Sequence, residues 1–335
     1  MSTMKVLPPH CEPQRTERSG PLIELKPGGP ANFFLVHDGD GNTHLYLNLA
    51  RRMPDSIAVF GIAPRGIVGV PLAHTRIEDM AASYVKEVRK RQPRGPYLLG
   101  GLCAGGVIAH EMASQLLHAG EIVELVVLLD AATPQAPKRR GRITGQRFHR
   151  LKLAIANACN RERSTIGQAC SVVAVASWKL VNALEWEIIR HGESWWVRAR
   201  FHLLHQLLAR QLPWPQYIPE LSLRQIYESA EAHYVPKPLR GVPTVLVRAR
   251  RRTPILSDTP YRAIYADETL GWGTITQELA IVDVDGGHST MLEEPFVQSL
   301  AAALLLHINR KSRAVATNIV SHRRSPTRRG RQVAQ

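Results

Sequence analysis

Short β-branched runs alternate with amphipathic helical stretches through most of this 335-residue chain. The runs predict strands: Phe33 to Val36, Ile57 to Ile62, Tyr97 to Gly100, Leu125 to Leu129, Thr244 to Val247 and Ala280 to Val284. Helical apolar spacing follows at Ile77 to Lys90, Val107 to Leu117 and Phe296 to Ile308. Strand and helix in alternation predict an α/β fold with a doubly wound, mostly parallel sheet.

The alternation stops between about residues 138 and 240, where the spacing is helical and no β-run occurs. Because this insertion separates two strands, it is expected over the carboxyl edge of the sheet, as a large helical lid. Residues 1–30, rich in Pro, Gly and charge, predict a flexible leader, and residues 309–335 a basic, disordered tail. One catalytic domain, residues 31–308, is expected between them.

The chain carries 43 Lys and Arg against 28 Asp and Glu, a net charge of +15 that favours an acidic partner. Nucleic acid, anionic lipid and an acidic carrier protein all qualify. The excess gathers in two segments, Lys138 to Arg163 and Arg310 to Arg331, and no specific nucleic-acid target is predicted. The first segment is as consistent with a solvated charged face as with a carrier-docking surface.

The four cysteines, at positions 11, 103, 159 and 170, have neither disulfide nor zinc spacing, so no metal and no cofactor are expected. The first residues lack the apolar core of a signal peptide, and no apolar run is long enough to span a bilayer. A cytoplasmic, reducing compartment is the expectation.

The pentapeptide Gly101-Leu102-Cys103-Ala104-Gly105 lies between a predicted strand and a predicted helix. This is the setting of a nucleophile elbow, a strained turn that exposes a reactive side chain and needs small residues two before and two after it. The helix that follows aims its free N–H groups and its dipole at the sulfur, which favours a thiolate. Cys103 is therefore the candidate nucleophile.

A general base is expected downstream of the elbow, and an acid must orient it. His288 follows the last predicted strand in the segment D-G-G-H-S-T, from which it can fold back over the elbow. Asp130, the first polar residue after the run L-V-V-L-L, is one candidate acid, and Asp258 and Asp267 are rivals. Any of the three gives the chain order Cys, Asp, His that is found in hydrolases with this elbow.

An oxyanion needs two N–H donors, one just past the nucleophile and one from the loop after the first strand. Ala104 supplies the first. The loop is H-D-G-D-G, His37 to Gly41, in which Gly39 is the favoured donor.

Together these motifs resemble the thioesterase domains of nonribosomal peptide synthetases and polyketide synthases, which belong to the α/β-hydrolase superfamily. The resemblance runs from about Pro21 to Ile308 and rests on four segments. They are I-E-L-K-P-G-G-P-A-N-F-F-L-V-H, P-Y-L-L-G-G-L-C-A-G-G-V-I-A-H-E-M-A, A-H-Y-V-P-K-P-L-R-G-V-P-T-V-L-V-R-A and L-G-W-G-T-I-T-Q-E-L-A-I-V-D-V-D-G-G-H-S-T-M-L-E-E-P. The acid of that family follows the strand after the elbow helix, so the resemblance favours Asp130.

Two positions depart from the family pattern. The family loop is usually His-Pro-x-Gly-Gly, and here Asp38 and Asp40 replace the Pro and the first Gly. Cys103 stands where Ser is usual, as it does in a minority of the family. A cysteine keeps the transferred acyl group activated as a thioester, so we expect an acceptor more demanding than water: an amine, or an internal group that closes a ring.

The resemblance implies release of an acyl or peptidyl chain from the phosphopantetheine thioester of a carrier protein supplied in trans, through an acyl-Cys103 intermediate. Three alternatives stay open. An editing thioesterase would hydrolyse stalled chains, a cysteine-elbow hydrolase would cleave free small esters or lactones, and a non-enzymatic docking module would be indifferent to loss of Cys103.

Overall fold

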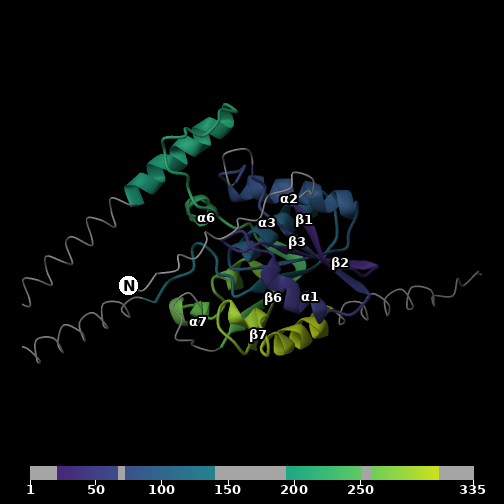
Figure 1. The fold of residues 1–335 in the computed structure, drawn as a ribbon. Coiled ribbons are helices and arrows are strands. Elements are labelled where there is room, and N and C mark those ends of the chain that lie inside the picture. The colour runs from purple at the N-terminus through teal and green to yellow at the C-terminus, as the bar shows by residue number, and fades with distance from the viewer. Residues whose placement is uncertain (1–20, 67–71, 140–193, 251–257, 309–335) are drawn as a thin grey trace, which may run out of the picture.

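A computed structural model describes residues 21–66, 72–139, 194–250 and 258–308 (Figure 1). Within these ranges seven strands form one sheet in the order β1-β3-β2-β4-β5-β6-β7. They are β1 (Leu22–Lys26), β2 (Ala31–Val36), β3 (Ile57–Ile62), β4 (Tyr97–Leu102), β5 (Val123–Leu129), β6 (Leu239–Ala249) and β7 (Thr276–Val284). β1 runs antiparallel to β3, and every other neighbouring pair is parallel.

Helices cover both faces of the sheet. They are α1 (Leu47–Arg51), α2 (Ile77–Arg91), α3 (Ala104–His118), α6 (Leu223–Glu231), α7 (Tyr261–Ile264), and two further helices at residues 194–209 and 297–308. Short 3-10 turns lie at η1 (His44–Tyr46), η3 (Trp272–Thr274) and η4 (Thr290–Leu292).

Alternate residues of β2 enter two separate apolar cores, as the two-residue period of a strand requires. Phe34 packs with α2 and α3 on one face, whereas Phe33 and Leu35 pack with α1 and the 297–308 helix on the other. Figure 1 shows these helices on the two faces of the sheet. Strands β3 and β4 are buried along their whole length, which explains their unbroken apolar sequences. The predicted α/β-hydrolase fold, doubly wound around a mostly parallel sheet, is confirmed.

The prediction that residues 1–30 form a flexible leader is wrong for residues 22–26. They form β1, which pairs with β3 from Leu22↔Ile62 to Lys26↔Val59. Its sequence L-I-E-L-K alternates apolar with charged residues because β1 is an edge strand, half exposed, and so lacks the β-branched run that marks the interior strands. Residues 1–20 lie outside the described part, as does the predicted tail, 309–335.

The predicted lid lies between β5 and β6. Its residues 140–193 are outside the described part of the chain, and the described remainder contains the 194–209 helix and α6. Ser222 begins α6 with a capping box in which it exchanges hydrogen bonds with Gln225. The N-terminus of α6 lies beside the first loop of the sheet, since a Cβ on Gly41 would come within 2.9 Å of Leu223.

No helix in the described ranges is long and apolar enough to cross a membrane.

Candidate active site

Cys103 stands at the junction between β4 and α3, with φ 54° and ψ −116°, a strained conformation for a residue with a side chain. The flanking glycines explain how the turn fits. A Cβ on Gly101 would lie 2.4 Å from the backbone of Gly105, and one on Gly105 would lie 2.5 Å from the carbonyl oxygen of Val36. Strand, turn and helix are in contact here, as the elbow motif predicts.

The buried Tyr46 holds the strand end that carries the elbow. Its hydroxyl accepts a hydrogen bond from the Leu102 amide at 2.8 Å and donates one to the Val36 carbonyl at 2.7 Å. Burial raises the pKa of Tyr46 above its ordinary value, so the phenol stays neutral and keeps both bonds.

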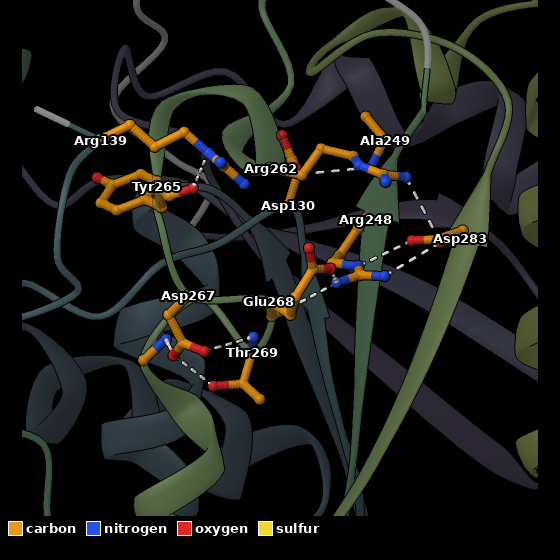
Figure 2. A network of polar contacts seen from close by, with 11 residues as sticks. Asp130, Arg139, Arg248, Ala249, Arg262, Tyr265, Asp267, Glu268, Thr269 and Asp283 are labelled. Atoms are coloured by element: carbon orange, nitrogen blue, oxygen red, sulfur yellow. Dashed lines mark hydrogen bonds and ion pairs between the residues drawn. The ribbon is translucent and has the colours of Figure 1, made fainter. Parts of the chain in front are cut away.

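Asp130 and His288 come together although 158 residues separate them. Asp130 follows β5, is fully buried, and takes φ 39°. Its Oδ2 lies 2.7 Å from His288 Nδ1 and accepts the Tyr261 amide at 2.9 Å. Its Oδ1 accepts the Ala249 amide at 3.3 Å (Figure 2). The carboxylate is thus fixed by backbone donors and directed at the imidazole.

The imidazole of His288 is held in its charged form. Burial lowers its pKa, but the hydrogen bonds to Asp130 and to Cys103 outweigh burial and raise the pKa to about 10. A protonated histidine bonded to the elbow cysteine favours thiolate at the sulfur. Cys103, His288 and Asp130, predicted as nucleophile, base and orienting acid, are therefore brought together in the structure.

The rival acids have contacts of their own elsewhere in the structure. Asp258 is buried and holds the backbone of the His288 loop: its Oδ1 accepts the amides of Ser289 at 2.6 Å and Thr290 at 3.0 Å, and its Oδ2 accepts the Thr290 hydroxyl at 2.8 Å. A Cβ on Gly287 would lie 2.0 Å from that Oδ2, so the loop needs glycine there.

Asp267 closes a different turn, accepting the Thr269 amide at 3.0 Å and the Gly271 amide at 2.7 Å (Figure 2). Nearby, Arg248 joins the last two strands to this turn: its guanidinium bonds Asp283 at 2.8 Å and Glu268 at 2.6 Å (Figure 2). Partial burial raises the pKa of Asp283, but the pairing with Arg248 outweighs it and lowers the pKa overall. These carboxylates support the frame around β6.

Tyr261, which is not among the residues predicted from the sequence, contacts Cys103 directly. Its hydroxyl lies 2.8 Å from Cys103 Sγ, and its ring stacks on His288 with centroids 4.4 Å apart. It is the first residue of the four-residue helix α7, in the segment S-D-T-P-Y-R-A-I, where no motif or apolar period marks it. The sequence gives no signal that would have found it.

The loop expected to supply the second oxyanion donor is a tight turn organised by Asp38. The Asp38 carboxylate accepts the amides of Asp40 at 3.0 Å and Asn42 at 2.9 Å. Gly39 lies next to the elbow helix, since a Cβ built on it would be 3.9 Å from the Cβ of Ala104. The two residues predicted as oxyanion donors, Gly39 and Ala104, are therefore neighbours.

The fold and this elbow define the class of protein. A nucleophile turn between β4 and α3, an aspartate after β5 and a histidine after β7 are the arrangement of an α/β-hydrolase. Among the described residues, no group of three or more His, Cys, Asp or Glu side chains is arranged to hold a metal ion.

Comparisons with known proteins show which family this chain is similar to. Residues 31–153 match the family model of the thioesterase domain. The non-reducing polyketide synthase Preu8 of Preussia isomera is 42% identical over 103 residues, which are 31% of this chain and 5% of the synthase. A dimodular nonribosomal peptide synthase of Bacillus subtilis is 38% identical over 111 residues, 33% of this chain and 5% of that protein. This chain thus aligns with a small part of much longer relatives.

Among solved structures, the four-domain nonribosomal peptide synthetase holo-AB3403 has a similar fold, with a TM-score of 0.52 and 23% identity over 86% of this chain and 20% of that one. Residues 31–153 are thus similar to the thioesterase domain, and the relatives that align with this chain are polyketide and nonribosomal peptide synthases, so the resemblance predicted from its motifs is confirmed.

Proposed function

We propose that this thioesterase domain releases an acyl or peptidyl chain from a carrier-protein phosphopantetheine thioester through an acyl-Cys103 intermediate. The observation that carries the proposal is the hydrogen bond between His288 and the buried Asp130, beside a cysteine in a positive-φ elbow. The similarity to polyketide and peptide synthases supports a carrier-bound substrate.

In the first half of the reaction, the Cys103 thiolate attacks the carrier thioester carbonyl. The carbon–sulfur bond to Cys103 forms, the bond to the pantetheine sulfur breaks, and the imidazolium of His288 gives its proton to the departing pantetheine thiolate. The negative charge that develops on the carbonyl oxygen is stabilised by hydrogen bonds from the amides of Ala104 and Gly39, our proposed oxyanion donors. Asp130 keeps the imidazole oriented throughout, with Nε2 left to serve the sulfur.

In the second half, the now neutral His288 takes a proton from the acceptor as the acceptor attacks the acyl group. The acyl-sulfur bond breaks and Cys103 returns to thiolate beside the imidazolium. Because the acyl group has remained a thioester, it retains the activation it had on the carrier. We propose that the acceptor is an amine, or a group within the chain that closes a ring.

We propose further that the carrier is a separate acidic protein. The domain needs no cofactor of its own in this scheme, since the phosphopantetheine arrives with the substrate. A nucleophilic thiol also fits a reducing compartment such as the cytoplasm.

The test loads the protein with an acyl-pantetheine donor, traps the acyl-enzyme by acid quench, and locates the acyl group by mass spectrometry. Amine and water are then compared as acceptors. Cys103→Ala is the control for loading, and Cys103→Ser keeps a nucleophile but forms an ester. We expect an acyl group on Cys103, and faster transfer to amine from the cysteine protein than from the serine variant. Release to water alone would overturn the acceptor proposal, and undiminished turnover by Cys103→Ala would overturn the nucleophile.

A further inference from the structure

Tyr261 touches each of the three proposed catalytic residues through a different part of itself. Its hydroxyl contacts the Cys103 sulfur at 2.8 Å. Its ring lies on the His288 imidazole with 17° between the planes. Its backbone N–H donates to Asp130 Oδ2 at 2.9 Å, the same oxygen that binds His288. The backbone bond and the stacking fix where the hydroxyl lies, so its contact with sulfur is not that of a freely rotating side chain.

The direction of the hydrogen bond follows from the surroundings of the phenol. Burial, and then the charge and hydrogen bond of Cys103, raise the pKa of Tyr261 above its ordinary value. The phenol therefore keeps its proton and is the donor, and the sulfur accepts. A donor to sulfur stabilises the thiolate more than the thiol, because hydrogen bonds to a charged acceptor are the stronger ones.

The two groups that contact the sulfur have complementary chemistry. His288 supplies a positive charge and a proton that can be transferred. Tyr261 supplies a hydrogen bond from a proton that it does not give up. The Cys103 sulfur therefore has two partners, the charged His288 and the neutral Tyr261 hydroxyl. The hydroxyl still donates its hydrogen bond after His288 has given its proton to the pantetheine leaving group.

We propose that Tyr261 is a further catalytic residue, whose hydroxyl stabilises the Cys103 thiolate both before acylation and when the acyl group departs. This inference rests on the proposed role of Cys103 as nucleophile. In the second half-reaction the acyl-sulfur bond breaks, the electron pair stays on sulfur, and the acceptor proton goes to His288. The Tyr261 hydroxyl donates a hydrogen bond to the negative charge that develops on the sulfur, and no proton leaves the tyrosine.

The test is the pH dependence of Cys103 alkylation by iodoacetamide, followed on the Cys103 peptide by mass spectrometry. This assay needs neither a carrier nor an acyl substrate. Tyr261→Phe keeps the ring that stacks on His288 and removes only the hydroxyl. Tyr265→Phe is the matched control, because it removes the same hydroxyl group from the neighbouring tyrosine. The ring of Tyr265 packs against that of Tyr261, with centroids 5.2 Å apart.

For Tyr261→Phe we expect alkylation at pH 7 to slow by about tenfold and its pH midpoint to rise by about one unit, the size of one charge-assisted hydrogen bond. Tyr265→Phe should follow the wild-type profile. A fluorotyrosine at position 261, which is a stronger donor of nearly the same size, should move the midpoint in the opposite direction.

An unchanged profile for Tyr261→Phe, or an equal shift for Tyr265→Phe, would overturn the proposal. Thermal melting of each variant shows whether it is folded, and the fluorotyrosine protein decides the question if the phenylalanine variant does not fold. The result is separable from the proposed function: a shifted profile with no acyl transfer would retain the sulfur contact and reject the thioesterase reaction on Cys103.

Discussion

Replacing Asp258 distinguishes the residue that holds the His288 loop from the residue that orients the imidazole. Asp258→Ala removes the acceptor for three donors of that loop, the amides of Ser289 and Thr290 and the Thr290 hydroxyl, at 2.6 to 3.0 Å. The carboxylate is only 3% exposed, so water does not reach the site without rearrangement.

The magnitude follows from those contacts. A hydrogen bond to a charged group contributes about 1.5–3 kcal/mol, and a buried donor left without an acceptor costs about 1–3 kcal/mol, less where the loop relaxes to satisfy it. We expect Asp258→Ala to lower the free energy of unfolding by about 3–5 kcal/mol. Acyl loading of Cys103 per folded molecule should fall by less than it does in Asp130→Asn.

Asp130→Asn is the paired variant. In the wild type, Asp130 Oδ2 accepts hydrogen bonds from His288 Nδ1 and the Tyr261 amide, and Oδ1 accepts one from the Ala249 amide. The amide oxygen of the asparagine must take the place of Oδ2, so its NH2 group then faces the Ala249 amide. Folding should lose about 1–3 kcal/mol from that one unsatisfied donor. Loading should fall by up to about ten-thousandfold, since the imidazole loses its orienting charge.

Urea denaturation measures the first quantity, and the mass-spectrometric loading assay, corrected for the folded fraction, measures the second. The reasoning is refuted if Asp258→Ala abolishes loading while leaving the denaturation midpoint unchanged. Asp258, the rival acid in the sequence analysis, would then be the residue that serves His288.

Three further predictions concern the loop and the base. Arg224→Ala breaks an ion pair with Asp40, and both side chains are more than half exposed. The free energy of unfolding should therefore fall by less than about 1 kcal/mol, and the difference from the wild type should shrink as salt is added. A loss above about 2 kcal/mol would contradict this prediction. Gly39→Ala finds no atom closer than 3.9 Å and keeps the backbone N–H, so the denaturation midpoint and Cys103 loading should both stay unchanged. Gly39→Pro removes that N–H and should slow loading, and equal loading of the proline variant would remove Gly39 from the oxyanion site. The pKa of His288 is raised from 6.5 to about 10, so the folding stability that its positive charge contributes is fully present below pH 6.5 and is lost as the pH rises through 10. An NMR titration of the imidazole ring with a midpoint near 6.5 would disprove this prediction.

The interior of the fold was predictable because its physics is local. A strand buried on both faces must be apolar throughout, and β3 and β4 are. The edge strands are not under that constraint. β7 begins T-Q-E-L, with exposed positions in it, and the sequence placed its start four residues late at Ala280. β1 was missed for the same reason.

Within the site, the residues that sequence reasoning selected are those with a backbone requirement. Cys103 is marked by the glycines that let strand and helix meet, and His288 by the glycines before it. Asp130 ends an apolar run. Asp258 could not be separated from Asp130 by pattern, because an aspartate that caps a loop and one that orients a histidine both follow strands. Tyr261 has no backbone requirement, and only the folded chain brings it to the sulfur.

The two aspartates that depart from the family loop have different physical roles. Asp38 replaces a proline, and its carboxylate binds the amides of Asp40 and Asn42, which fixes the turn by hydrogen bonds where a proline would fix it through its ring. Asp40 pairs with Arg224 of α6, so the loop that carries Gly39 is joined to the described end of the lid insertion. A change in the position of α6 would therefore be expected to move Gly39, the proposed oxyanion donor. In this chain, then, Leu223 and Arg224 at the start of α6 lie against the loop that carries Gly39, and substitutions of these two residues should alter acyl loading even where they touch no substrate.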